Sequence, residues 1–258
     1  MLSIPANGLA FGVDKTRRER FSLRQARYYA LGQTIAGMAA EAKKKGDSFR
    51  MLDIGIQHGV SRRYIERHAD TEQIEYHGAD LALLPTIYRP DSWTLYTGDL
   101  TEGYPQIPSD HFDVVICEQV LEHLPSVETA MKALSRVLKP GGTMIVGVPI
   151  FPLGLHLARR HIVPIIDAIN PWARSRGHLQ AFSLRSFTNL LEEHAGVEIT
   201  EMRGFRIISG GILRPLENQQ WWWKMNCKLG KMLPSLCIET QVLATKPQSE
   251  AATLSKAA

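Results

Sequence analysis

The stretch from Phe49 to Val60 (FRMLDIGIQHGV) constrains this chain more than any other part of its 258 residues. Residues of strand type lead into a turn that holds Gly55 and Gly59, and a helix-like segment, 61–68, follows at once. In an α/β sheet, a strand, a tight glycine turn and a helix present backbone N–H groups and a helix N-terminus to a cofactor. The carboxylate of Asp53 would repel a phosphate there. We therefore expect a cofactor with a cationic or hydroxyl-rich end rather than a pyrophosphate.

The composition limits the classes of protein to which the chain can belong. Hydrophobic residues make up 44% and charged residues 22%, as in a soluble globular protein, and 258 residues suffice to bury a full core. The formal net charge is only +4 and no long basic block occurs, so we predict no nucleic-acid partner. Three cysteines without close-pair spacing indicate neither a disulfide framework nor a zinc site, and they favour a reducing compartment.

The sequence also bears on location. The first fifteen residues hold Pro5, Asn7 and two glycines but no basic start followed by an apolar run, unlike a secretory signal. The most apolar window, 144–158, is broken by glycines and prolines and is too short to span a bilayer. We therefore expect a cytoplasmic protein.

Strand-type and helix-type patterns alternate along most of the chain. Strands separated by helical segments predict an α/β fold with a mostly parallel sheet and helices on both faces. Proline and glycine in Leu138–Gly142 predict a helix stop and a turn before the fifth strand. The expected strands are 49–54, 74–79, 93–97, 112–117, 143–148, 197–205 and 238–246, and the expected helices are 16–45, 61–68, 127–138 and 184–195.

The first helical segment, 16–45, has two interpretations. Its apolar residues, among them Leu31 and Ile35, recur at three-, four- and seven-residue spacing. In the first interpretation the helix packs on the edge of the sheet, because aromatic residues on a helix face usually belong to the core. In the second it is an N-terminal lid over the active site, with Tyr28 and Tyr29 facing the substrate.

Four acidic side chains follow the ends of successive expected strands. They are Asp53, Asp80, Asp99 and Glu118, after the first, second, third and fourth strands. Ligands of open α/β sheets bind outside the carboxyl ends of the strands. An acid after the second strand suits two ribose hydroxyls, and an acid after the third can accept a hydrogen bond from an adenine amino group, which Leu100 can cover. A lone aspartate often only caps a turn, but four acids in register indicate a ligand site.

The chain resembles the class I S-adenosylmethionine-dependent methyltransferases, in the broad small-molecule group that includes ubiquinone-pathway O-methyltransferases. The resemblance covers residues 49–149, with weaker support from 178–205 and the last strand. It implies a Rossmann-like, doubly wound sheet of seven strands with the last strand antiparallel, helices on both faces, helical lid insertions and S-adenosylmethionine as cofactor. The matching stretches are Leu52–Gly59, Gly78–Asp80, Gly98–Leu100, Phe112–Pro125 and Leu138–Gly142.

The resemblance implies roles for individual residues of the cofactor site. The two turn glycines would let the backbone approach the methionine part, and Asp53 would favour the α-amino group. Asp80 would bind the ribose, and Asp99 with Leu100 would bind adenine. Glu118 and Gln119 would line the wall beside the sulfonium. The complete set is Asp53, Gly55, Gln57, Gly59, Asp80, Leu81, Asp99, Leu100, Glu118 and Gln119.

Gln57 departs from the family pattern. It stands where the family usually has the middle glycine of the turn. This difference implies either an altered turn or a contact between the side-chain amide and the cofactor.

The motif Leu121–Pro125 holds the first candidate catalytic residue, His123. An imidazole titrates near neutral pH, so His123 can act as a general base or contact the substrate. Alternatively, His123 caps a helix or packs beneath the sheet, while Glu122 is a solvated charge. In some ubiquinone-pathway relatives, acids and a histidine of this motif hold a divalent cation; our prediction names no metal ligand.

His178 is the second candidate catalytic residue. The segment Gly177–Ser183 resembles the part of relatives where the chain returns from an insertion to the sheet, so His178 would face the acceptor pocket. Ser183 is a suitable N-cap for the helix expected at 184–195.

Two insertions are expected to cover the substrate. Their parts 150–170 and 219–233 mix apolar and basic residues, so each would either rest on a membrane as a peripheral contact or pack as a lid over a soluble substrate. The expected organisation is one domain over 1–246, with a core at 49–149, covers at 150–177 and 206–235, and a disordered tail at 247–258.

These features predict a methyltransferase that acts on a small-molecule acceptor, at a hydroxyl oxygen of an aromatic, sugar or lipid-like metabolite. Because the cofactor is already activated, alignment carries most of the catalysis, and His123 or His178 takes the proton. N- or C-methylation and a non-catalytic cofactor-binding module stay open. A nicotinamide oxidoreductase is disfavoured because Gln57 and Val60 replace two glycines of its G-x-G-x-x-G motif.

Overall fold

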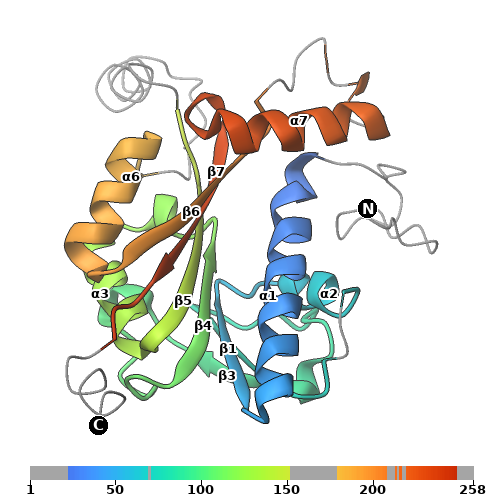
Figure 1. Cartoon of the computed structure of the whole chain (residues 1–258). Coiled ribbons are helices and arrows are strands. Elements are labelled where there is room, and N and C mark those ends of the chain that lie inside the picture. Colours follow the sequence, from blue (N-terminus) through green and yellow to red (C-terminus); the bar gives the residue numbers. More distant parts are fainter. Residues whose placement is uncertain are drawn as a thin grey trace, which may run out of the picture.

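A seven-stranded sheet runs through the centre of the protein, whose computed structural model describes residues 23–68, 71–151, 179–207, 213, 215–216 and 219–248 (Figure 1). The strand order is β3-β2-β1-β4-β5-β7-β6, and only β7 runs antiparallel to its neighbours. The seven strands and the antiparallel last strand are as predicted. The strands are β1 (Phe49–Ile54), β2 (Ile74–Asp80), β3 (Thr94–Thr97), β4 (Phe112–Glu118), β5 (Leu138–Pro149), β6 (Glu198–Phe205) and β7 (Glu239–Thr245).

Helices cover both faces of the sheet because side chains alternate along each strand. In β4, Val115 and Cys117 enter one hydrophobic cluster, and Val114 and Ile116 enter the other. Residues of α3 (Val127–Val137) and α6 (Leu184–Leu190) complete the first cluster. Residues of α1 (Ala26–Lys45) and α2 (Val60–Ile65) complete the second.

Helix α1 packs on the face of the sheet and not on its edge, which corrects the first interpretation of this segment. Leu31 and Ile35 lie in one cluster with Met51 of β1 and Ile116 of β4. These two strands are central because β1 and β4 pair with each other in the middle of the sheet. The helix ends at Lys45, the predicted last residue, and Gly46 caps it with a φ of 75°. The first part of the predicted helix, 16–22, lies outside the described residues.

Most predicted boundaries agree with the structure to within one residue, but two differ by more. The second helix ends at Ile65 and not at residue 68. The predicted turn at Leu138–Gly142 is wrong, since these residues already belong to β5. Gly141 has a φ of 78°, and its N–H donates to the carbonyl oxygen of Lys246 over 2.8 Å. The first residues of β5 are therefore irregular in backbone and register, but they remain hydrogen-bonded within the sheet.

The helix predicted at 184–195 begins as expected. The Ser183 hydroxyl accepts a hydrogen bond from the N–H of Ser186 over 3.1 Å, which confirms Ser183 as the N-cap. The helix continues as α6 and closes with a π-helical turn, Leu191–Ala195.

Helix α7 (Gln220–Met232) lies across the end of the molecule at which α1 begins (Figure 1). It packs directly on β6, because a Cβ at Gly230 would lie 2.0 Å from the carbonyl oxygen of Gly204. The ring of Trp223 meets the edge of Tyr29 of α1 at a centroid distance of 5.6 Å. Within the described ranges, none of the helices combines the length and the apolar character that crossing a bilayer requires. The other predicted cover, at 150–177, lies almost wholly outside these ranges.

Candidate active site

The turn after β1 adopts a left-handed backbone at three positions. Gly55 and Gly59 have φ of 77° and 65°, and Gln57 has a φ of 45°. A Cβ added at Gly55 would lie 2.3 Å from Cγ2 of Val120, so this position has no room for a side chain. Gln57 therefore keeps a glycine conformation without being glycine, at a cost of about 1 kcal/mol.

Asp80 holds Gln57 in that conformation. The Gln57 N–H donates to Oδ2 of Asp80 over 3.0 Å, and the Leu81 N–H donates to Oδ1 over 2.8 Å. Two backbone donors thus fix the carboxylate at the carboxyl end of β2, and each oxygen keeps a further lone pair for a ligand hydroxyl. The side chain of Leu81 is exposed, so it is the backbone of Leu81 that orients this acid.

Asp99 has the local capping role that lone aspartates often have. Its Oδ1 accepts hydrogen bonds from the N–H and the hydroxyl of Thr101, over 2.8 and 2.7 Å, and caps the short helical turn Leu100–Glu102. The side chain of Leu100 is buried in the core with Tyr104. The adenine contacts of Asp99 and Leu100 stay predictions.

Asp53 lies at the end of β1 and is only 5% exposed. The hydroxyl of Ser61 in α2 donates to its Oδ2. Burial raises the pKa of Asp53 to about 7; the Ser61 bond opposes this rise and the charge of Asp80 adds to it. Such a carboxyl gains strongly from a cation placed beside it, which fits its predicted role toward an amino group.

Glu118 belongs to a buried polar network between α1, β4 and β7. Its Oε1 accepts a hydrogen bond from Nε2 of Gln241 over 2.7 Å, and its Oε2 lies 3.1 Å from Nε of Arg27. Arg27 also donates to Glu239 over 2.9 Å. Burial raises the pKa of Glu118 to about 7, although the charge of Arg27 lowers it. Both carboxylate oxygens are therefore engaged within the protein, and the predicted contact with the sulfonium stays a prediction.

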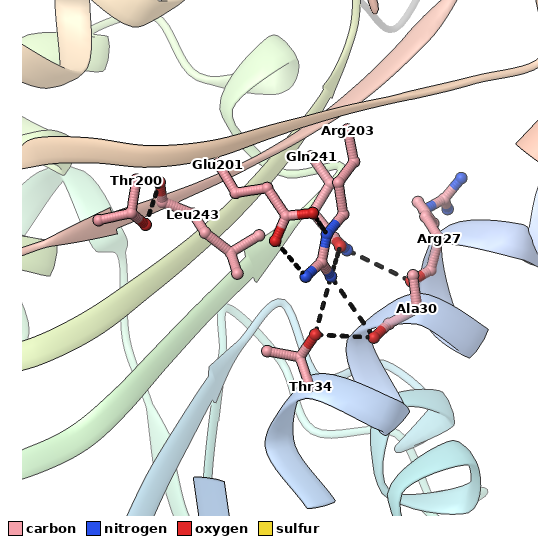
Figure 2. Close-up of polar contacts among 8 residues, drawn as sticks. All are labelled: Arg27, Ala30, Thr34, Thr200, Glu201, Arg203, Gln241 and Leu243. Atoms are coloured by element: carbon pink, nitrogen blue, oxygen red, sulfur yellow. Dashed lines mark hydrogen bonds and ion pairs between the residues drawn. The ribbon is translucent and has the colours of Figure 1, made fainter. Parts of the chain in front are cut away.

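Gln241 extends this network to β6 (Figure 2). Its Oε1 accepts from the guanidinium of Arg203 over 3.3 Å, and its Nε2 donates to the carbonyl oxygen of Arg27 over 3.3 Å. Arg203 also donates to Thr34 over 2.8 Å and to both carboxylate oxygens of Glu201. These bonds tie the N-terminal half of α1 to the antiparallel part of the sheet, and no sequence pattern predicts them.

Gln119 combines two unfavourable features. Its φ is 59°, in the left-handed region, and its N–H donates to the carbonyl oxygen of Gly147 over 2.8 Å. Its side-chain Nε2 is buried and has no hydrogen-bond partner among the described residues. A buried donor without a partner costs about 1–3 kcal/mol, so its presence at a strand end indicates a place for a ligand acceptor atom.

The next motif carries a buried acid, Glu122. Its side chain is 1% exposed, and neither carboxylate oxygen accepts a hydrogen bond from another residue in the described part of the chain. The interpretation of Glu122 as a solvated charge is therefore wrong. Burial raises its pKa to about 7. A hydrogen bond from the backbone of Glu122 itself and the charge of His123 oppose this rise. The sequence gives no direct sign of this burial, because the motif forms only a short helical turn, Leu121–His123.

His123 stands beside this acid at the surface. Its Nε2 lies 4.0 Å from Oε1 of Glu122, and its side chain is 47% exposed. The carbonyl oxygen of Glu122 accepts hydrogen bonds from the N–H groups of Leu179 and Gln180, over 2.7 and 3.0 Å. The motif thus contacts the segment that directly follows His178. His178 itself lies outside the described residues, and its predicted role is untested.

The two tyrosines of α1 have different surroundings. Burial raises the pKa of the Tyr28 hydroxyl, and the nearby charges of Glu118 and Asp53 add to the rise. Tyr29 instead packs against Trp223. Of the two residues in the lid hypothesis, Tyr28 is the one whose ring packs on Arg27, the ion-pair partner of Glu118, with the guanidinium carbon 4.8 Å from the ring centroid.

No metal centre is visible in these parts of the protein. Among the described residues, no group of three or more histidine, cysteine, aspartate or glutamate side chains is placed to hold a metal ion.

Comparison with known families shows what the chain is similar to. Residues 22–202 match the family described as a methyltransferase domain. A ubiquinone biosynthesis O-methyltransferase of Klebsiella pneumoniae is 22% identical over 186 residues, which cover 62% of this chain and 77% of that protein. The corresponding enzyme of Pseudomonas fluorescens is 26% identical over 149 residues, and the match spans 50% of this chain and 63% of the Pseudomonas enzyme.

Solved structures with the same fold are more distant in sequence. An S-adenosylmethionine-dependent methyltransferase from Mesorhizobium loti aligns over 87% of this chain and 98% of its own, with 14% identity and a TM-score of 0.55. The 4+2 cyclase SpnF aligns over 88% of this chain and 82% of its own, with 16% identity and a TM-score of 0.54. At these identities the likeness concerns the fold alone.

Proposed function

The chain belongs to the class I S-adenosylmethionine-dependent methyltransferases, and we propose that it methylates a hydroxyl oxygen of a small-molecule acceptor. The observation that carries the proposal is the Glu122–His123 pair, a buried carboxyl that accepts no hydrogen bond from another described residue, 4.0 Å from an imidazole that is half exposed. Glu122 stands two residues after Val120, and Cγ2 of Val120 lies so close to Gly55 that an added Cβ would be 2.3 Å from it. An acid and a base therefore lie next to the predicted methionine end of the cofactor.

The strand-end residues fit S-adenosylmethionine. Asp80 offers two fixed carboxylate oxygens to the ribose hydroxyls, and the buried Asp53 offers a negative charge to an amino group. Gln119 offers an unused amide donor at the neighbouring strand. When bound, the cofactor supplies an electrophilic methyl group, so the protein has to align the acceptor and remove a proton.

The side chains of the Glu122–His123 pair divide this work. The carboxyl of Glu122 accepts the hydrogen bond of an acceptor hydroxyl or orients the ring of His123, and Nε2 of His123 takes the proton. A hydroxyl is the group that needs this assistance, because its proton must leave as the new C–O bond forms. The two relatives are ubiquinone biosynthesis O-methyltransferases, and this similarity supports oxygen as the methylated atom.

The proposal is tested by incubating the full chain with small-molecule extracts and a cofactor labelled in its methyl group. We expect a labelled product whose methyl group resides on oxygen, and no product with Asp80→Ala. Once the acceptor is known, His123→Ala and Glu122→Gln should each lower kcat by about a hundredfold while calorimetry shows unchanged cofactor affinity. A product labelled on nitrogen or carbon would contradict the hydroxyl assignment. Cofactor binding without product in any extract would favour the non-catalytic module.

A further inference from the structure

Large apolar side chains gather on the surface of α7 and the turn that follows it. Trp221 is 57% exposed, Met232 65% and Leu236 50%. Leu233 and Ile238, which lie beside them in sequence, are 43% and 37% exposed. Exposed apolar residues are common singly, but a cluster on one short segment indicates a binding surface.

Packing within the protein does not require these side chains. The opposite side of α7 makes the internal contacts, with Trp222, Trp223, Asn226 and Gly230 buried against the rest of the protein. Trp221 directly precedes the buried Trp222, but its own side chain is exposed to solvent. Among the described residues, its ring contacts only the ring of Trp222, edge to face. The exposed tryptophan is thus available to an external partner.

Lysines share the outer side of the helix. Lys224 and Lys228 are exposed and follow Trp221 at three and seven residues, on one helical stripe. Neither has an ion pair among the described residues, whereas Lys231 is close enough to Glu201 to lower the pKa of that carboxyl. From Gln219 to Ile238 the sequence has no acidic residue, so the charge of this segment is entirely positive.

We propose that this outer surface docks on an anionic lipid bilayer. We call it the α7 face and define it as Trp221, Lys224, Lys228, Met232 and Leu236. Tryptophan, aliphatic side chains and lysines on one helical surface are the combination that binds in the interface of a membrane, with rings and chains among the headgroups and ammonium groups at lipid phosphates. Helix α7 has 13 residues, too few to span a bilayer, so the contact is peripheral.

Charge complementarity decides between this occupant and a second copy of the chain. Two α7 faces packed together would bring Lys224 and Lys228 of both copies into one apolar interface, where like charges repel. An anionic leaflet instead attracts them, and the cytoplasmic leaflet, which a cytoplasmic protein would meet, is the anionic one.

The position of the α7 face gives the contact a use. The buried side of α7 shares a hydrophobic cluster with Tyr28 and Tyr64, and the ring of Tyr28 packs on Arg27, the ion-pair partner of Glu118. A bilayer bound to the outer side would therefore lie near the proposed acceptor site, where a lipid-soluble acceptor can be collected. This last consequence rests on the proposed function; the membrane contact itself does not.

The test is co-sedimentation of the full chain with vesicles of phosphatidylcholine, with and without phosphatidylglycerol. We expect binding to the anionic vesicles that weakens as salt is added. Lys224→Glu with Lys228→Glu should weaken it by about thirtyfold or more, since each lysine near an anionic surface contributes roughly a fivefold affinity. Trp221→Ala should weaken it by about tenfold through lost apolar burial. The matched control is Lys132→Glu with Arg185→Glu, the same charge change at exposed sites on α3 and α6, and it should bind as the unmodified chain does.

The proposal is overturned by any of three results. The first is that the unmodified chain does not bind anionic vesicles. The second is that the control pair loses as much binding as the α7 pair, which would mean that only the net charge of the protein matters. In sedimentation velocity without lipid, a dimer that Trp221→Ala dissociates would identify a second copy as the occupant. All substituted side chains are exposed, and equal circular dichroism spectra and melting temperatures establish that each variant is folded.

Discussion

The glycine turn after β1 and the buried acids beside it differ in how far their polar groups find partners within the protein. In the turn, Asp80 accepts two backbone hydrogen bonds, and three left-handed residues hold the chain in place. The acids Asp53, Glu118 and Glu122 are at most 6% exposed, and burial is the first cause that raises the pKa of each to about 7. The polar groups of the turn have their partners within the protein, and Glu118 has Gln241 and Arg27. Asp53 and Glu122 have fewer partners, so a ligand has more to offer them.

The difference indicates where the protein gives up stability for binding. A satisfied turn presents the same geometry with or without ligand and contributes preorganisation. A buried carboxyl with few partners costs stability until a cation or a hydrogen-bond donor arrives. Changes in the turn should therefore weaken binding or folding, whereas neutralising Asp53 or Glu122 should stabilise the protein and impair its function.

The largest expected effect is loss of cofactor affinity in Asp80→Ala. The substitution removes the acceptor of two ribose hydroxyls and also the acceptor for the N–H groups of Gln57 and Leu81. Two hydrogen bonds to a charged group correspond to about 4 kcal/mol, or about a thousandfold in Kd, by titration calorimetry with S-adenosylmethionine. Asp91→Ala, at an exposed aspartate outside the site, is the matched control. Affinity that survives in Asp80→Ala would refute the placement of the ribose.

The next effect concerns the fold of the turn. In Gly55→Ala the added Cβ meets Cγ2 of Val120 at 2.3 Å, and the residue keeps a φ of 77°. We expect a loss of about 3 kcal/mol in the free energy of unfolding, measured in urea. Adding Val120→Ala should recover only the part due to the clash. A double variant as stable as Val120→Ala alone would show that the backbone at residue 55 relaxes freely.

The third prediction concerns pH and the acid cluster. The folded-state pKa of Asp53, about 7, lies above its ordinary value of 3.8, so the folded protein holds this proton more tightly than the unfolded chain. The resulting stability is complete below 3.8 and is lost as the pH rises to about 7. Asp53→Asn has no proton to lose. It should lose about 2 kcal/mol less stability than the unmodified chain between about pH 5 and about pH 7.

Two further measurements sharpen this comparison. Glu122→Gln should flatten the stability profile over the same pH range, because burial also raises the pKa of Glu122 to about 7. Asp53→Asn should bind the cofactor more weakly although it is more stable at pH 7, which separates the cost in stability from the gain in binding. Profiles identical to that of the unmodified chain would mean that the buried acids are hydrated in solution.

The strands and the strand-end acids could be predicted because their signals are local. Each of the first four strands is a short run that leads into a glycine or an acid, and that pattern placed Asp53, Asp80 and Asp99 at one edge of the sheet. The capping serine, Ser183, was equally local, since its partner is only three residues away. The doubly wound sheet of seven strands and the antiparallel direction of β7 were expected from the resemblance and not from any such pattern.

The features that were missed depend on residues far apart in the sequence. Gln241 reaches Glu118 across 123 positions, and Arg27 reaches Glu239 across 212. A glutamine in a strand and an arginine in a helix look like surface residues until the chain is folded. The same reason explains Leu138–Gly142, which looks like a turn but continues as a strand because Lys246 pairs with its glycines. Burial of Glu122 likewise depends on packing that its own turn does not specify.

Gln57 gives the smallest effect and the finest test of the turn. Its φ of 45° favours glycine, and its side chain is exposed, so its link to the site is the backbone N–H that donates to Asp80. Gln57→Gly should be about 1 kcal/mol more stable to urea than Gln57→Ala, because alanine keeps the left-handed strain that glycine relieves. Both variants retain the N–H, so both should bind S-adenosylmethionine as tightly as the unmodified chain. An equal loss of affinity in both would instead assign a cofactor contact to the glutamine amide, and the residue that departs from the family pattern would then be a ligand in its own right.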